Sequence, residues 1–258
     1  MKKYILTIIL LITFISIFAQ KDRNNTLLKA ALNGIEYEIK AGWNIGGTTP
    51  IPLPEEIRSI DGYNPTLSLT LQGNMTKWFG QSKKWGISTG LRLENKGMIT
   101  KATVKNYSMK IIGNGGEEIS GYWTGGVKTK VENSCLTVPL LAAYKISPRW
   151  DIKVGPYISY LINGDFSGHV YEGYLREDDP TGPKREFTDG KIANYDFSNE
   201  LRRMQYGMQI GGSWKAFSHF NIYGEFTFGM NDIFRSSFNT ISFNMYPIFL
   251  NLGFGYAF

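Results

Sequence analysis

Apolar and polar residues alternate with period two in eight separate segments of the chain. The last segment is the most regular: every second residue from Ile248 to Phe258 is apolar, and the positions between are small or polar except for Phe249. Successive side chains of a β-strand point to opposite faces, so this period predicts strands with one apolar face. The eight predicted strands are 37–45, 67–75, 85–94, 136–146, 151–162, 204–216, 220–230 and 248–258.

The lengths of the predicted strands and of their connections indicate a membrane barrel. Strands of about 9 to 13 residues suit a tilted crossing of a bilayer, whereas strands of soluble proteins average about five or six. Long connections alternate with short ones, as do the extracellular loops and periplasmic turns of outer-membrane barrels. The long connections, which we predict to be extracellular loops, are 46–66, 95–134, 163–203 and 231–247.

The predicted fold is therefore all-β: a closed, antiparallel, transmembrane β-barrel of eight strands in an up-and-down meander. Closure is expected because hydrocarbon offers no hydrogen-bond partner to an open sheet edge. No segment after the first twenty residues is apolar for long enough to form a membrane-spanning helix.

The first residues have the pattern of a secretory signal peptide. Lys2 and Lys3 precede an apolar stretch, 5–18, that ends beside the small residue Ala19. Such a stretch is about 21 Å long as a helix, too short for a membrane anchor. We predict a signal peptide at 1–19, a periplasmic lead-in at 20–34, and an outer-membrane barrel domain at 35–258.

Composition alone is typical of a soluble protein rather than of a membrane barrel. The chain has 258 residues, of which 42% are hydrophobic and 14% aromatic, with 29 glycines, one cysteine and a net charge of +6. Its mean hydropathy of −0.21 is typical of a soluble protein. In a barrel, however, half of each strand faces a polar interior and many aromatic residues form belts at the membrane boundaries. Trp78, Trp85 and Trp150, at strand ends, are expected in such belts. The mild basic balance gives no argument for nucleic acid.

Charged residues fall on the predicted inner face. An eight-stranded barrel has room inside for little more than side chains. We therefore expect these charges to pair with one another and with trapped water, so that the lumen is plugged. The alternative is the polar lining of a conducting pore. The predicted lumen charge network consists of Glu38, Lys40, Arg92, Glu94, Lys145, Lys153, Lys215 and Glu225.

Three stretches resemble known outer-membrane proteins. The end of the chain, 251–258, resembles the last strand that the barrel-assembly machinery of Gram-negative bacteria recognises, with Tyr256 and Phe258 as the signal. The blocks 136–145 and 154–161, Leu-Thr-Val-Pro-Leu-Leu-Ala-Ala-Tyr-Lys and Val-Gly-Pro-Tyr-Ile-Ser-Tyr-Leu, resemble the centre of the PorT-like outer-membrane β-barrel family, often labelled porin-family proteins. That resemblance implies an eight-stranded barrel in the outer membrane. The secretion and gliding role of its best-known member is not carried over.

The loops contain no convincing reactive group, so we expect no enzyme. His169 lies near Asp165, Ser167 and Glu172, but such neighbours occur by chance in a loop. His219 is expected to be solvated and Cys135 to be an apolar filler. The acidic residues of the third long loop match no calcium motif, so no catalytic residue, metal or cofactor is predicted. These acidic residues are Glu177, Asp178, Asp179, Glu186 and Asp189.

The second long loop contains a predicted β-ribbon. Residues 98–112 alternate loosely and precede Gly113-Asn-Gly-Gly116, which is typical of a hairpin turn. The open edges of such a ribbon would suit a partner that adds a strand, whereas a lid over the barrel mouth is the simpler alternative.

We expect a membrane scaffold or binding protein. Its expected partners are outer-membrane lipid, the assembly machinery and an unidentified extracellular or envelope protein. A small-solute channel and an accessory of a secretion or gliding complex are the alternatives.

Overall fold

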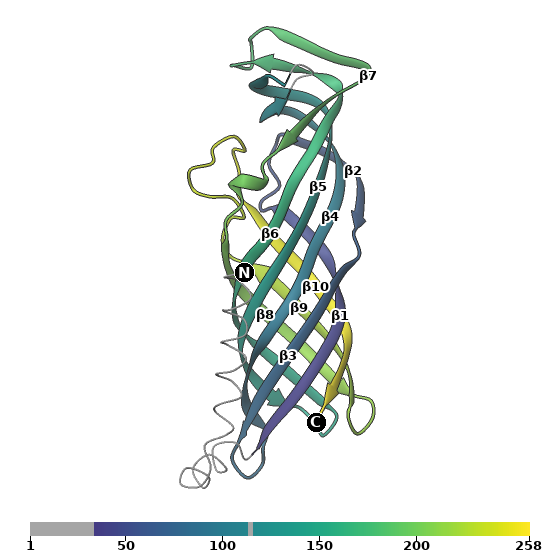
Figure 1. The fold of residues 1–258 in the computed structure, drawn as a ribbon, viewed down its shortest axis with the longest axis vertical. Helices are drawn as coiled ribbons and strands as arrows, with labels where there is room; N and C mark the ends of the chain where they lie inside the picture. The colour runs from purple at the N-terminus through teal and green to yellow at the C-terminus, as the bar shows by residue number, and fades with distance from the viewer. Residues whose placement is uncertain (1–33, 113–115) are drawn as a thin grey trace, which may run out of the picture. The chain divides into compact units, whose positions relative to one another are not determined.

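The computed structural model describes residues 34–112 and 116–258, and residues Glu36–Phe258 form one compact unit. The predicted signal peptide and all of the lead-in except Gly34 lie outside the described residues. The unit is built from ten strands and one short 3-10 helix, η1 (Figure 1). These are β1 (Ile35–Pro50), β2 (Ile57–Pro65), β3 (Ser68–Phe79), β4 (Trp85–Ile112), β5 (Glu118–Lys145), β6 (Trp150–Glu177), β7 (Lys184–Asp196), η1 (Ser198–Glu200), β8 (Met204–Lys215), β9 (Phe220–Gly229) and β10 (Met245–Ala257).

Eight of the ten strands form a ring of antiparallel neighbours. Its order is β1, β3, β4, β5, β6, β8, β9, β10 and back to β1, with β4–β5 pairing completing the circle. Each of the eight predicted strands corresponds to one of these. The all-β, antiparallel prediction is therefore confirmed, with two further strands, β2 and β7, inside connections predicted to be loops.

β4, β5 and β6 are 28 residues each and run well beyond the ring (Figure 1). There they form a sheet in the order β2-β4-β5-β6-β7, which we call the extension. It comprises β2, β7 and residues 97–112, 118–134 and 163–177 of the long strands. The predicted ribbon exists, but the prediction of open edges is wrong: β2 pairs with β4, and β6 covers the other edge of β5.

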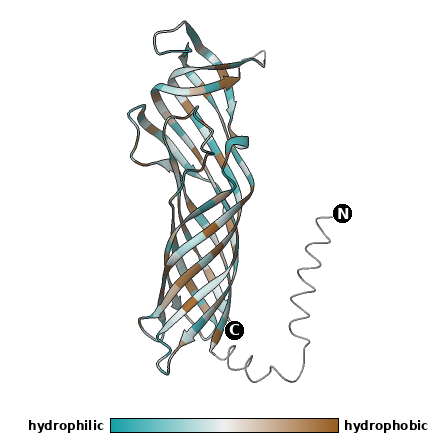
Figure 2. Cartoon of the chain, turned by 90° about the vertical axis from the view of Figure 1, so that its left-hand side faces the viewer, coloured by the Kyte–Doolittle hydropathy of each residue, from teal (hydrophilic) through white to brown (hydrophobic). Residues whose placement is uncertain are grey.

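Inward and outward positions of the ring differ sharply in polarity. In β3, exposed Leu69 and Leu71 alternate with buried Thr70 and Gln72, and Figure 2 shows this alternation along the strands. Apolar side chains thus cover the outside of the ring. Within 34–112 and 116–258, no helix is long and apolar enough to cross a membrane. Trp78 departs from the expected aromatic belt, because it is buried inside the ring, where its indole N–H donates to Glu36 Oε2 at 2.9 Å.

The extension has an apolar interior. Ile111, Trp123, Val170 and Leu175 are fully buried there, and the connection between β9 and β10 adds Ile233, Phe234 and Ile241 to the same cluster, beside Met245 at the start of β10. This connection, predicted to be an extracellular loop, therefore packs into the extension. Burial of these side chains holds it in place.

Candidate functional site

Charged side chains, all buried except partly exposed Asp151, form one continuous chain of ion pairs inside the ring. Cations and anions alternate along it: Asp151, Lys153, Glu38, Lys40, Glu225, Arg92, Glu94 and Lys96, in order of contact. These residues come from β6, β1, β9 and β4, because each sits at an inward position of the period-two pattern. β6 lies opposite β1 in the ring order, so the chain crosses the interior.

The first half of the chain joins β6 to β1. Lys153 Nζ lies 3.9 Å from Asp151 Oδ1 and 3.6 Å from Glu38 Oε2. Glu38 Oε2 also lies 3.4 Å from Lys40 Nζ, and its other oxygen accepts a hydrogen bond of 2.8 Å from the Asn221 amide. A buried carboxylate with two cations and an amide donor keeps its charge without water.

The second half joins β1 to β9 and β4. Lys40 Nζ lies 3.0 Å from Glu225 Oε1, and the other Glu225 oxygen lies 3.4 Å from the Arg92 guanidinium. Arg92 lies 3.7 Å from Glu94, which in turn lies 2.9 Å from Lys96. Arg92 is fully buried and also donates to the Gln209 side-chain oxygen.

Hydrogen bonds from neutral side chains complete the two inner carboxylates. Thr137 donates to Glu94 at 2.6 Å, and the Gln209 amide donates to Glu225 at 2.9 Å. With four cations and four anions, the chain carries no net charge. Neutrality and added donors are what make such a buried network tolerable in a low-dielectric interior.

The ion-pair chain differs from the predicted lumen network at four positions. Six predicted residues lie in it: Glu38, Lys40, Arg92, Glu94, Lys153 and Glu225. Lys145 instead lies at the rim, 3.5 Å from Glu36 and over the Trp78 ring at 4.0 Å.

Lys215 was predicted in the lumen and is exposed. It pairs in register with inward-facing Asn221, but as the last residue of β8 it reaches water at the rim. Asp151 and Lys96 were missed. Lys96 lay in a predicted loop, although its alternation with Arg92 and Glu94 could have indicated it.

The residues considered for catalysis do not come together. Asp165, Ser167 and His169 occupy alternate positions of β6 in the extension, and His169 pairs in register with Lys128 and Asn194. Asp165 contacts Lys130 and Ser198, and among the described residues His169 makes no hydrogen bond to either neighbour. Burial, followed by Lys128 and Lys101, lowers the pKa of His169.

The acidic residues between β6 and β7 make separate local contacts. Glu177 contacts Arg185, Glu186 contacts Lys184 at 2.7 Å, and Asp179 accepts from Thr181 at 2.6 Å. Across the described part of the chain, no three His, Cys, Asp or Glu residues gather as metal ligands. Cys135 is buried and free at the top of the ring.

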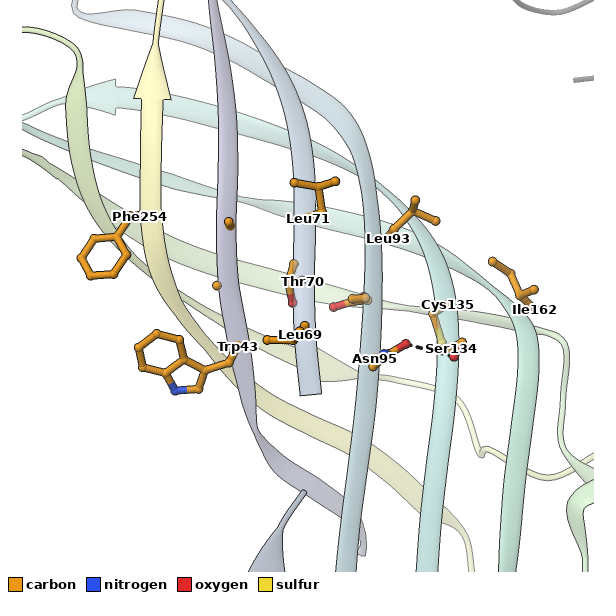
Figure 3. Close-up of a pocket in the computed structure, with 13 residues that line it drawn as sticks. Trp43, Leu69, Thr70, Leu71, Leu93, Asn95, Ser134, Cys135, Ile162 and Phe254 are labelled. Atoms are coloured by element: carbon orange, nitrogen blue, oxygen red, sulfur yellow. Dashed lines mark hydrogen bonds between the residues drawn. The ribbon is translucent and has the colours of Figure 1, made fainter. Parts of the chain in front are cut away.

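The outer face carries a shallow apolar groove of about 550 Å³ (Figure 3). Leu71, Leu93, Ile162 and Phe254 project along it from four strands of the ring. A hydrogen bond of 2.9 Å from Ser134 to Asn95 marks its polar end.

Comparison of the sequence with protein families identifies the family of this chain. Residues 18–235 match the outer membrane protein beta-barrel domain. The chain belongs to this family of outer-membrane β-barrel proteins. Membership indicates an outer-membrane location. No curated protein matches the sequence.

The chain is also similar to solved outer-membrane proteins, with low sequence identity and low TM-scores. The attachment invasion locus protein Ail of Yersinia pestis is 11% identical, with 86% of this chain and 98% of that chain covered and a TM-score of 0.38. The outer membrane protease OmpT of Escherichia coli is 12% identical, with 88% and 97% covered and a TM-score of 0.34. OprG of Pseudomonas aeruginosa is 14% identical, with 86% and 95% covered and a TM-score of 0.30.

Proposed function

We propose that this protein is a non-conducting, plugged outer-membrane scaffold that binds a partner through its extension and is not an enzyme. The continuous ion-pair chain across the ring interior is the observation that carries the proposal. Arg92, Lys40 and Glu94 are each at most 3% exposed, so protein contacts replace the water that a permeating solute would need. An ion entering this interior would have to break several buried pairs.

The extension supports the binding role. Its apolar core fixes β4, β5 and β6 beyond the ring and presents polar side chains outward, as at Lys101 and Thr103. A rigid surface binds a partner with little loss of conformational entropy. An accessory role in a secretion or gliding complex remains an alternative to this proposal.

Conductance in planar bilayers tests the plug. We expect the purified wild-type protein to be electrically silent. A variant with Arg92→Ser and Glu225→Ser removes the middle of the ion-pair chain and serves as the comparison, because shorter side chains leave space for water. Stepwise wild-type conductance that disappears on charge reversal at Lys153 would contradict the proposal and identify a small-solute channel.

Site-specific photocrosslinking in intact cells tests the binding role. A photoreactive residue is placed at Lys128 in the extension or, as a matched control on the same strand, at lipid-facing Leu140. We expect one defined protein adduct from position 128 and only lipid adducts from position 140. Identical capture at both positions, or capture of lipid alone, would refute the binding role without affecting the conductance result.

A further inference from the structure

An apolar chamber lies inside the extension, above the ion-pair chain. Its volume is about 100 Å³, of the same order as the ~150 Å³ apolar cavities that take up benzene-sized molecules. Most of its wall is apolar, so water gains few hydrogen bonds there. The apolar wall includes Met98, Val104, Val127, Phe166, Phe243 and Met245.

The chamber opens beside the unpaired edge of β2. Among the described residues β2 pairs in register with β4 alone, and its other edge faces the end of β1, where the Tyr63 hydroxyl donates to the Gly46 carbonyl oxygen at 2.8 Å. Leu53 and Ile60 line the chamber and yet are 54% and 60% exposed. An apolar molecule can therefore enter between β1 and β2 without crossing the charged ring interior.

Tyr107 brings a polar group to the chamber wall. A β-bulge between Val104 and Tyr107, with Asn106 at φ 53°, turns Tyr107 to the inside of β4. Its ring packs edge-on against Phe243 at 5.7 Å, and its hydroxyl has no hydrogen bond among the described residues. Burial and then the Glu56 carboxylate raise the pKa of Tyr107, so the hydroxyl stays protonated. Tyr107 is partly buried, so its hydroxyl is free to donate a hydrogen bond to a bound acceptor.

We propose that this chamber binds a small neutral molecule with an apolar body about the size of one ring and a single hydrogen-bond acceptor such as a carbonyl. The apolar wall holds the body, and the Tyr107 hydroxyl donates to the acceptor. This site is distinct from the outward surface of the extension, so it does not depend on the proposed partner.

Fluorine NMR titration of the protein in lipid nanodiscs tests the proposal with two probes, 4-fluoroacetophenone and fluorobenzene. We expect saturable binding of both probes beyond their partition into empty nanodiscs. Tyr107→Phe should weaken the ketone about three- to tenfold, the value of one hydrogen bond, and leave fluorobenzene unchanged. Ala102→Leu, which fills the chamber, should weaken both probes at least about tenfold.

Ala142→Leu is the matched control, because Ala142 is exposed on the outer face of β5 and the substitution adds the same atoms outside the chamber. It should bind both probes as the wild type does. Heat-modifiable migration in gels verifies that each variant is folded. Absence of saturable binding to the wild type, or wild-type binding by Ala102→Leu, would overturn the site. Equal weakening of both probes by Tyr107→Phe would overturn the role of the hydroxyl.

Discussion

The ring and the extension share three strands, β4, β5 and β6, but have opposite interiors. Along β4, the inward residues of the ring are Arg92 and Glu94, whereas those of the extension include Val104 and Ile111. The outward residues change in the reverse sense, from exposed Leu93 to exposed Lys101. The period of two persists while its polarity inverts.

This change of polarity indicates which face of the sheet lies in lipid and which lies in water. A face in lipid is apolar, and an eight-stranded ring then has only its interior for polar groups. A face in water is polar, and burial of apolar side chains inside then stabilises the structure as in a soluble protein. The level at which polarity changes, near Asn95 on β4, therefore marks the upper boundary of the membrane.

The largest effect is expected from the charged interior of the ring. Glu225→Ala leaves Lys40 and Arg92, which it contacts at 3.0 and 3.4 Å, without their shared anion. Loss of one partner of a buried pair costs about 3–5 kcal/mol of the free energy of unfolding. Urea unfolding of the protein in lipid vesicles measures this change.

An exposed pair of the extension supplies the control for Glu225→Ala. Lys130 and Glu132 lie 2.9 Å apart with both side chains about half exposed. Glu132→Ala should cost at most about 1 kcal/mol, because water already solvates both charges. Equal losses in the two variants would mean that the ring interior is hydrated and that the contrast between the regions is wrong.

A smaller effect on stability is expected from substitutions on the outer faces of the ring and of the extension, which we compare on β5. Leu140 is 57% exposed near the middle of the ring portion of β5, and Ser120 is exposed on the extension portion. Leu140→Lys should cost about 2–4 kcal/mol, because it places a charge in hydrocarbon. Ser120→Lys should stay within about 0.5 kcal/mol. The same vesicle experiment measures both, and a tolerated Leu140→Lys would place this face in water.

The eight ring strands could be predicted because their alternation is regular and each has one mostly apolar face. The extension could not, because bulges change the phase of the pattern. Inward positions of β4 are even-numbered up to Val104 and odd-numbered from Tyr107, after the bulge. A single period fitted across residues 98–112 therefore mixes the two faces. Packing of the β9–β10 connection into the extension leaves no periodic signal at all.

The charged site was predicted as far as face alone determines it. The alternation along each strand predicted that Lys40, Arg92 and Glu225 face inward. Alternation does not tell, however, how high a residue lies along the barrel axis. Lys215 falls on an inward position of the alternation and is still exposed to water, because β8 ends at this residue. Partner choice across the ring, as between Lys153 and Glu38, depends on strand tilt and register, which no local pattern encodes.

The smallest predicted effect concerns His169 on the outer face of the extension. Burial, then Lys128 and Lys101, lower its pKa below the usual 6.5, and the register places Lys101, Lys128 and His169 in one row across β4, β5 and β6. A histidine whose pKa is lowered by folding contributes stability that is fully present above pH 6.5 and is lost as the pH falls through the folded pKa.

Lys128→Gln removes one repulsion, so NMR titration should show the His169 pKa rising toward 6.5 while remaining below it, since burial and Lys101 persist. Lys105→Gln, outside this row, is the control and should leave the titration unchanged. An unchanged His169 pKa in Lys128→Gln would mean that water screens the row completely, and the outer face of the extension would then carry no electrostatic coupling between strands.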